Sequence, residues 1–222
     1  MRTVIGEILP LALVVTVSPL NIIPSILLLF TEKPKRTASA FLLGFVVGVG
    51  LVLGVIVVVA GVINLTTGAG SSTWAVVIKG ILGIYLIAAG IRKFRARPRG
   101  EAHVMLPGWM DSLSSSSPPR ALGVGAVLGA ANPKNVVVAL AAGVVVSTGG
   151  LTATQQAISC ALYVAIAAAG VAAPIVTVLL LGERSGHVLE EWRHWLERNN
   201  TTVMAVLFFV FGVVLLGQAI SG

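Results

Sequence analysis

The chain has 222 residues, of which 56% are hydrophobic and only 10% charged, and its mean hydropathy is +0.99. Soluble proteins carry about 25% charged residues, so this composition excludes a water-soluble globule and leaves no room for a separate catalytic domain. The net charge of +7 would suit nucleic acid, but the basic residues lie at the ends of hydrophobic runs, and we predict no nucleic-acid partner.

Six apolar segments are long enough to cross a bilayer, since a spanning helix needs about 20 mainly apolar residues. In chain order they are Val4–Phe30, Thr37–Ile63, Thr73–Ile91, Ala121–Ser147, Thr154–Leu181 and Thr201–Ile220. The first exceeds the roughly 7–15 apolar residues of a signal peptide, so we expect a retained helix. The sequence predicts an all-α membrane protein with six transmembrane helices.

The basic residues indicate how these spans are oriented, because lysine and arginine gather in cytoplasmic loops. The loops after the first, third and fifth spans hold 12 of the 15 basic residues, whereas the loops Asn64–Ser72 and Thr148–Ala153 hold none. We therefore predict a multi-pass protein of the inner (plasma) membrane. Both termini are expected outside, and the long basic loop is expected in the cytoplasm.

Two cytoplasmic stretches are more than short connections. Residues 183–199 place Trp192 and Trp195 at helical spacing among charged residues, which is typical of an interfacial amphipathic helix. A surface helix packed on the bundle is the alternative. Residues 94–119 form a basic, serine-containing linker, expected to be flexible, between a first unit of residues 1–93 and a second of residues 120–222.

One short motif occurs in both units. Ser18-Pro19-Leu20-Asn21 lies midway along the first span, and Asn132-Pro133-Lys134-Asn135 lies midway along the fourth, 114 positions later. Each motif opens a set of three spans, and since three is odd, the two sets must have opposite orientations. This pattern predicts two inverted three-helix repeats, an arrangement in which transporters bind substrate near mid-membrane.

The motif residues are those that end one helix and begin another. Proline removes a backbone hydrogen bond inside a helix, whereas serine or asparagine followed by proline is a good helix start. We expect new half-helices to start at Ser18-Pro19 and Asn132-Pro133, with amide groups and helix dipoles that favour an anion. The alternative is that the prolines merely kink two helices.

Charged residues inside the spans are few. Lys134 lies near mid-membrane and Lys79 lies about a third of the way into the third span, although Lys79 could instead reach the outer surface. We expect no aspartate or histidine at depth, so the sequence predicts an anionic or zwitterionic substrate and no metal or other cofactor. Glycines such as Gly44 and Gly48 permit close helix contact, either within one chain or in a homodimer.

The segments Ser18-Pro19-Leu20-Asn21-Ile22-Ile23-Pro24, Pro107-Gly108-Trp109-Met110 and Asn132-Pro133-Lys134-Asn135 resemble the actinobacterial GAP family. These are glycopeptidolipid- and sulfolipid-addressing proteins within the LysE exporter superfamily. The resemblance spans essentially the whole chain. It implies a 3+3 inverted-repeat fold and export of a lipid or glycolipid, and it adds Pro24 to the motif residues.

The sequence and the resemblance together predict a transporter that delivers an anionic lipid or glycolipid, or its precursor, toward the cell surface. One rival is a non-transporting adaptor that recruits a lipid synthase or a larger transporter, and another is an exporter of small anionic or amino-acid-like metabolites. An enzyme is not expected, because no histidine or aspartate is predicted at depth to activate a serine. The predicted substrate-binding residues are Ser18, Pro19, Asn21, Pro24, Lys79, Asn132, Pro133, Lys134 and Asn135.

Overall fold

The computed structural model describes residues 1–67, 73–96, 108–113 and 115–220, and the regular structure among them is helical. The helices are α1 (Arg2–Thr16), α2 (Pro19–Leu28), α3 (Pro34–Thr67), α4 (Thr73–Arg95), η1 (Gly108–Leu113), α5 (Pro118–Ala131), α6 (Pro133–Thr148), α7 (Ala153–Leu181), η2 (Gly182–Arg184) and α8 (Ser185–Ile220). Residues 68–72 of one predicted outer loop, and residues 97–107 and 114 of the predicted linker, lie outside the described residues.

Several of these helices can cross a membrane. By length and composition, α3 over Pro34–Ile63, α7 and α8 each qualify alone, and the bent pairs α1–α2 and α5–α6 raise the total within the described part of the chain to as many as five. The chain is therefore an all-helical, multi-pass membrane protein, as predicted. Helix α4 covers the predicted third span but is not among these five, so the sixth span stays a prediction.

Two of the predicted spans are broken at the repeated motif. The axes of α1 and α2 differ by 52°, and those of α5 and α6 by 57°. Pro19 and Pro133 are the first residues of α2 and α6, where the missing proline N–H costs no helical hydrogen bond. Pro174 lies inside α7 without ending it, so proline alone does not set a break.

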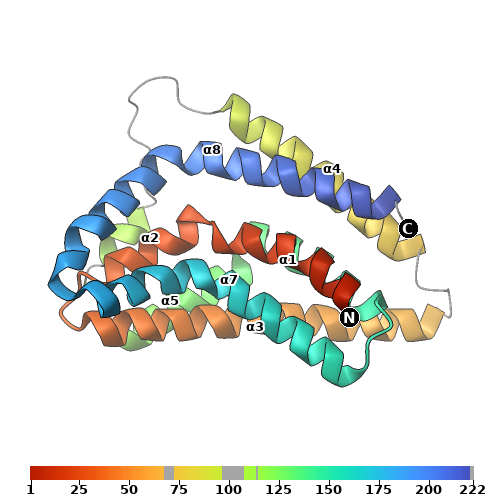
Figure 1. Ribbon diagram of the computed structural model, residues 1–222, viewed down its shortest axis with the longest axis horizontal. Coiled ribbons are helices and arrows are strands. Elements are labelled where there is room, and N and C mark those ends of the chain that lie inside the picture. Colours follow the sequence, from red (N-terminus) through yellow and green to blue (C-terminus); the bar gives the residue numbers. More distant parts are fainter. Residues whose placement is uncertain (68–72, 97–107, 114, 221–222) are drawn as a thin grey trace.

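The helices form layers around the broken segments (Figure 1). Helices α1 and α2 run between the α4–α8 pair on one side and α3 with α7 on the other, and the amino terminus and the end of α8 lie at the same end of the molecule. Helix α3 packs on α5 and α6, whereas α7 packs on α1 and α2. Most residues of α2 and α6 are buried, so the half-helices after the breaks form the centre of the structure.

Small residues let α3 and α5 pack closely. A Cβ atom at Gly48 would collide with the carbonyl oxygen of Ala126, and one at Gly125 with that of Phe41. The close contact predicted for the glycines of the second span thus lies within the chain, against α5. Helix α3 also carries an exposed apolar stripe at Leu43, Val47, Leu51 and Val55, which suits lipid rather than water.

Replacing two glycines of α3 by alanine is expected to change the stability of the protein in different directions. We expect Gly48→Ala to lower the melting temperature of the purified protein in detergent, because the added methyl group meets the α5 backbone. At Gly54 a Cβ atom meets nothing within 4 Å, so Gly54→Ala should be neutral or stabilising by up to about 1 kcal/mol, the difference in helix propensity. Equal effects at the two positions would contradict this packing.

The two stretches predicted to be cytoplasmic contain helical segments where the structure describes them. The predicted interfacial segment at residues 183–199 is not a separate helix, because α8 runs without interruption from Ser185 to Ile220 and curves as it passes into its second half (Figure 1). Part of the predicted flexible linker forms η1, whose Met110 and Leu113 are buried near α2. These apolar anchors explain why η1 is held against the bundle.

Candidate functional site

The two motifs meet where the break between α1 and α2 lies against the break between α5 and α6, and we call this place the crossing. The side-chain amide of Asn132 donates to Oδ1 of Asn21 over 3.5 Å, and Nζ of Lys134 donates to the carbonyl oxygen of Val14 over 2.7 Å. These contacts join residues 111 and 120 positions apart in the sequence. The structure therefore brings the predicted motif residues of both units into one cluster.

The two breaks are capped differently. Oδ1 of Asn132 accepts a hydrogen bond from the backbone N–H of Lys134 over 3.1 Å, so the predicted asparagine cap is present at the start of α6. The predicted serine cap is absent, because the Ser18 side chain makes no hydrogen bond at the start of α2. Ser18 is fully buried, and its Oγ has no partner among the described residues. This hydroxyl therefore has hydrogen-bonding capacity that the described part of the chain does not use.

The asparagine that ends each motif makes the same kind of hydrogen bond in both units. Nδ2 of Asn21 donates to the carbonyl oxygen of Val15 over 3.4 Å, and Nδ2 of Asn135 donates to that of Leu128 over 3.0 Å. Both acceptors lie in the last turn of the half-helix before the break, where carbonyl groups lack helical partners. Oδ1 of Asn135 is buried and has no partner within the described ranges, so it is a second polar group with unused hydrogen-bonding capacity.

Lys134 supplies positive charge at this crossing. Its residue is 8% exposed, and its ammonium group lies at the carboxyl end of α1, which the helix dipole makes favourable. An ammonium group has three N–H donors, and within the described ranges one acceptor, the Val14 carbonyl, and no carboxylate is found for them. Two donors thus remain for an anionic ligand.

The third motif proline and Lys79 occupy different surroundings. Pro24 is buried in α2 and has no N–H, so the helix cannot satisfy the carbonyl group of Leu20 in the usual way. Lys79 is not at the crossing, because its Nζ lies 3.2 Å from Oε2 of Glu7 in the first half of α1. The structure therefore separates Lys79 from the other predicted site residues and gives it an acidic partner.

This ion pair is expected to stabilise the contact between α4 and α1. The Lys79 and Glu7 side chains are 12% and 30% exposed, and removing one member of a largely buried pair leaves the other charge uncompensated. We expect Lys79→Met and Glu7→Gln each to lower the melting temperature, and the charge-exchanged double variant to restore most of it. Additive losses in the double variant would show that the two groups act independently.

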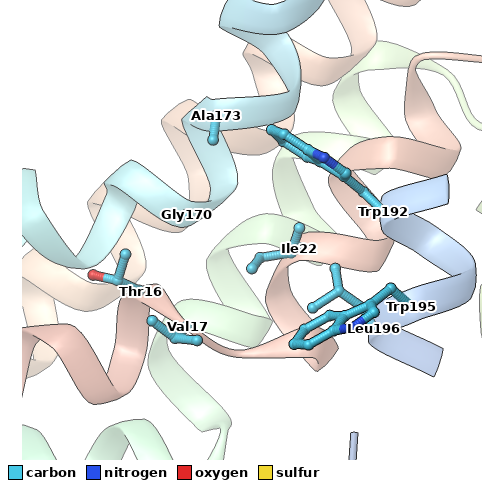
Figure 2. Close-up of a pocket in the computed structure, with 8 residues that line it drawn as sticks. All are labelled: Thr16, Val17, Ile22, Gly170, Ala173, Trp192, Trp195 and Leu196. Atoms are coloured by element: carbon cyan, nitrogen blue, oxygen red, sulfur yellow. The ribbon is translucent and has the colours of Figure 1, made fainter. Parts of the chain in front are cut away.

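An apolar groove opens beside the first break (Figure 2). It has a volume of about 420 Å³ and is lined by Thr16, Val17, Ile22, Gly170, Ala173, Trp192, Trp195 and Leu196. The two indole rings come from the first part of α8, and Gly170 and Ala173 face them from α7 (Figure 2). Sequence reasoning identified the tryptophans as interfacial residues but missed the groove, because its walls come from four separate helices.

Helix α7 is held against the first break by hydrogen bonds. Oγ1 of Thr16 donates to the carbonyl oxygen of Ile166, and Oγ of Ser25 donates to that of Val171 over 2.8 Å. Between them, a Cβ atom at Gly170 would collide with the carbonyl oxygen of Thr16. The glycine thus allows α7 to cross directly over the end of α1.

The cluster offers hydrogen-bond donors and positive charge rather than metal ligands. Within the described ranges, no group of three or more His, Cys, Asp and Glu residues could hold a metal ion. The crossing instead combines a buried ammonium group, an unpartnered hydroxyl and the starts of two half-helices, all of which favour oxyanions or hydroxyl groups.

Comparison with known proteins gives one informative match. The sequence model of the family described as Sap, sulfolipid-1-addressing protein, matches residues 8–221 of this chain. No curated protein and no solved structure matches the chain. The family match includes both motifs, the groove and nearly all of the helical bundle.

Proposed function

Because the chain belongs to the family of Sap, the sulfolipid-1-addressing protein, we propose that it is a transporter for an anionic lipid or glycolipid, or its precursor. It moves this substrate across the plasma membrane toward the cell surface, with the basic loops in the cytoplasm. The observation that carries the proposal is the crossing of two broken helices with Lys134 buried between them. In membranes, non-helical backbone at depth is tolerated where it is covered by protein or lines a cavity.

We propose that the architecture is two inverted repeats of three spans, as in the LysE superfamily to which GAP-family proteins belong, with α4 as the sixth span. Three features support this. The breaks lie in corresponding helices, Asn21 and Asn135 make corresponding hydrogen bonds, and α3 packs on α5–α6 as α7 packs on α1–α2. In such folds the substrate lies between the repeats.

The charge of the substrate follows from the chemistry of the crossing. Lys134 has two N–H donors without acceptors among the described residues, and a phosphate or sulfate ester would accept them. A cation would face the ammonium group without a compensating carboxylate. We propose a carrier rather than an enzyme, with no chemical step on the substrate.

The experiment compares the surface-extractable and cell-retained polar lipids of a strain that lacks the protein with those of a strain that carries it. We expect one anionic or glycosylated lipid to reach the surface only when the protein is present, and to accumulate inside the cell otherwise. An unchanged lipid distribution would remove the lipid proposal and favour small anionic metabolites as substrates.

The adaptor alternative is separated by a third strain with Lys134→Ala at matched membrane levels. An adaptor recruits its synthase or transporter through exposed surfaces, so it should tolerate a change at a residue that is 8% exposed. A transporter that binds the substrate at the crossing should not. Full delivery of the lipid by the Lys134→Ala strain would favour the adaptor.

A further inference from the structure

The groove beside the first break is lined almost entirely by apolar groups. Apart from the two indole N–H groups, the only lining side chain that forms hydrogen bonds is that of Thr16. Its hydroxyl already donates to backbone carbonyl groups. Its volume of about 420 Å³ lies within the range of about 300–1,000 Å³ typical of ligand pockets. The hydrogen bonds of the crossing do not fill this groove or depend on it.

The groove lies beside the part of the chain that carries the polar groups of the crossing. Val17 lines the groove and is followed by Ser18, whose buried Oγ has no partner among the described residues. Thr16, also in the lining, is two residues beyond Val14, the acceptor of the Lys134 ammonium group. Residues 14–18 thus carry both a wall of the groove and contacts of the crossing, as a ligand with a polar head and an apolar chain requires.

The far wall of the groove indicates that it meets the lipid interface. Trp192 and Trp195 are 39% and 50% exposed, and tryptophan prefers the boundary between headgroups and acyl chains. The same part of α8 carries three glutamates as well as Arg193 and Arg198, and Arg193 pairs with Glu197 over 2.7 Å, so the positive charge for an anionic headgroup comes from Lys134 and not from this segment. An acyl chain, rather than a protein segment, matches this combination of an apolar floor with half-exposed aromatic walls.

We propose that the groove of Figure 2 holds an acyl chain of the transported lipid while its anionic headgroup lies at the crossing of the broken helices. This inference rests on the proposed function and specifies it: the substrate is an anionic lipid with at least one saturated or unsaturated hydrocarbon chain. Trp192 and Trp195 contact the chain, and Lys134 with Ser18 contacts the headgroup.

The two indoles allow a direct binding test on the purified protein in uncharged detergent. Of the four tryptophans, Trp74 and Trp109 are replaced by phenylalanine, so that the remaining fluorescence comes from the groove. The probes are phosphatidylglycerol and phosphatidylcholine with brominated acyl chains, since bromine quenches tryptophan at close range. Phosphatidylglycerol tests the anionic headgroup, and phosphatidylcholine is its zwitterionic counterpart.

A filled groove provides the matched variant. Ala173→Phe places a ring between the walls, and Ile22→Phe does so from α2 if the first variant fails to fold. The control is Val206→Phe, in a second apolar pocket of about 330 Å³ between α4 and α8 that lies at neither break. All proteins are compared by gel filtration before titration.

We expect quenching by brominated phosphatidylglycerol to saturate near one lipid per protein, and quenching by phosphatidylcholine to require at least about tenfold more lipid. Filling the groove should remove the saturable part, Val206→Phe should retain it, and Lys134→Met should make the two lipids alike. Quenching that rises without saturation, or that persists in both filled variants, overturns the inference. Equal saturable quenching by the two lipids in the wild type overturns it as well, since the chain would then bind without the anionic headgroup.

The binding test and the transport test can give different results, and each combination has a different meaning. If the strain experiment shows lipid delivery but quenching is non-specific, the protein is a transporter whose acyl-chain site lies elsewhere. If quenching is saturable but no lipid changes its distribution in the cell, the groove binds lipid and the transporter proposal is wrong.

Discussion

Replacing Lys134 with methionine is expected to reduce delivery of the anionic lipid about 10- to 100-fold while leaving nearly normal amounts of folded protein in the membrane. A hydrogen bond from a charged group contributes about 1.5–3 kcal/mol, and each 1.4 kcal/mol changes an affinity tenfold. Methionine keeps an unbranched apolar side chain of similar length but provides neither charge nor donors. Headgroup recognition should therefore be lost without a change in shape.

The stability of this variant should change little because two effects oppose each other. The Val14 carbonyl group loses the donor at 2.7 Å, which costs about 1–3 kcal/mol for a buried acceptor. Removing an uncompensated charge from the membrane interior offsets this, since such a charge costs about 2.5–3.5 kcal/mol. The melting temperature in detergent measures the balance, and the distribution of labelled lipid between cell and surface measures delivery.

Two further variants isolate the role of the buried charge. Lys134→Arg keeps the charge, but its planar fork fits a site built around a compact ammonium group poorly, so we expect partial delivery. Lys35→Met removes a lysine from an exposed position near the start of α3 and should leave delivery unchanged. Equal losses in Lys134→Met and Lys35→Met would show that overall positive charge, and not the crossing, governs transport.

The breaks could be predicted from the sequence because their cause is local. Proline at the first position of a helix, preceded by an extended residue, is decided by neighbours in the chain, and Ser18 and Asn132 are both extended. The repeat of the motif also identified which two helices break. The sequence does not predict that the Asn132 side chain contacts Asn21, because that contact depends on how helices distant in the chain pack.

The remaining differences have the same physical origin. Ser18 follows the pattern of a cap, yet in the buried break its hydroxyl has no partner among the described residues, as only the packing of α1, α2 and α7 could reveal. Lys79 was predicted at the substrate site because intramembrane charge is unusual, but Glu7, 72 positions away, pairs with it. Tertiary partners decide whether a charge is free, and they are not encoded in local spacing.

The largest loss of stability is expected for Gly170→Val. At this position the backbone of α7 rests on the carbonyl oxygen of Thr16, so any side chain must push α7 away from the break. Overpacking a tight contact costs about 1–3 kcal/mol and occasionally more. The displacement also weakens the hydrogen bonds of Thr16 and Ser25 to α7, each contributing about 1 kcal/mol.

Gly61→Val is the matched control for the change of residue type. Both glycines lie inside long helices, and a Cβ atom at Gly61 meets nothing within 4 Å, so the control shows the helix propensity of valine alone. Thermal unfolding of both variants in detergent should give a drop at position 170 that exceeds the control by at least about 2 kcal/mol. If Gly170→Val instead matches the control, α7 cannot lie directly on the end of α1. The floor of the groove and the clamp on the broken helix would then both be wrong, since each depends on that single close approach.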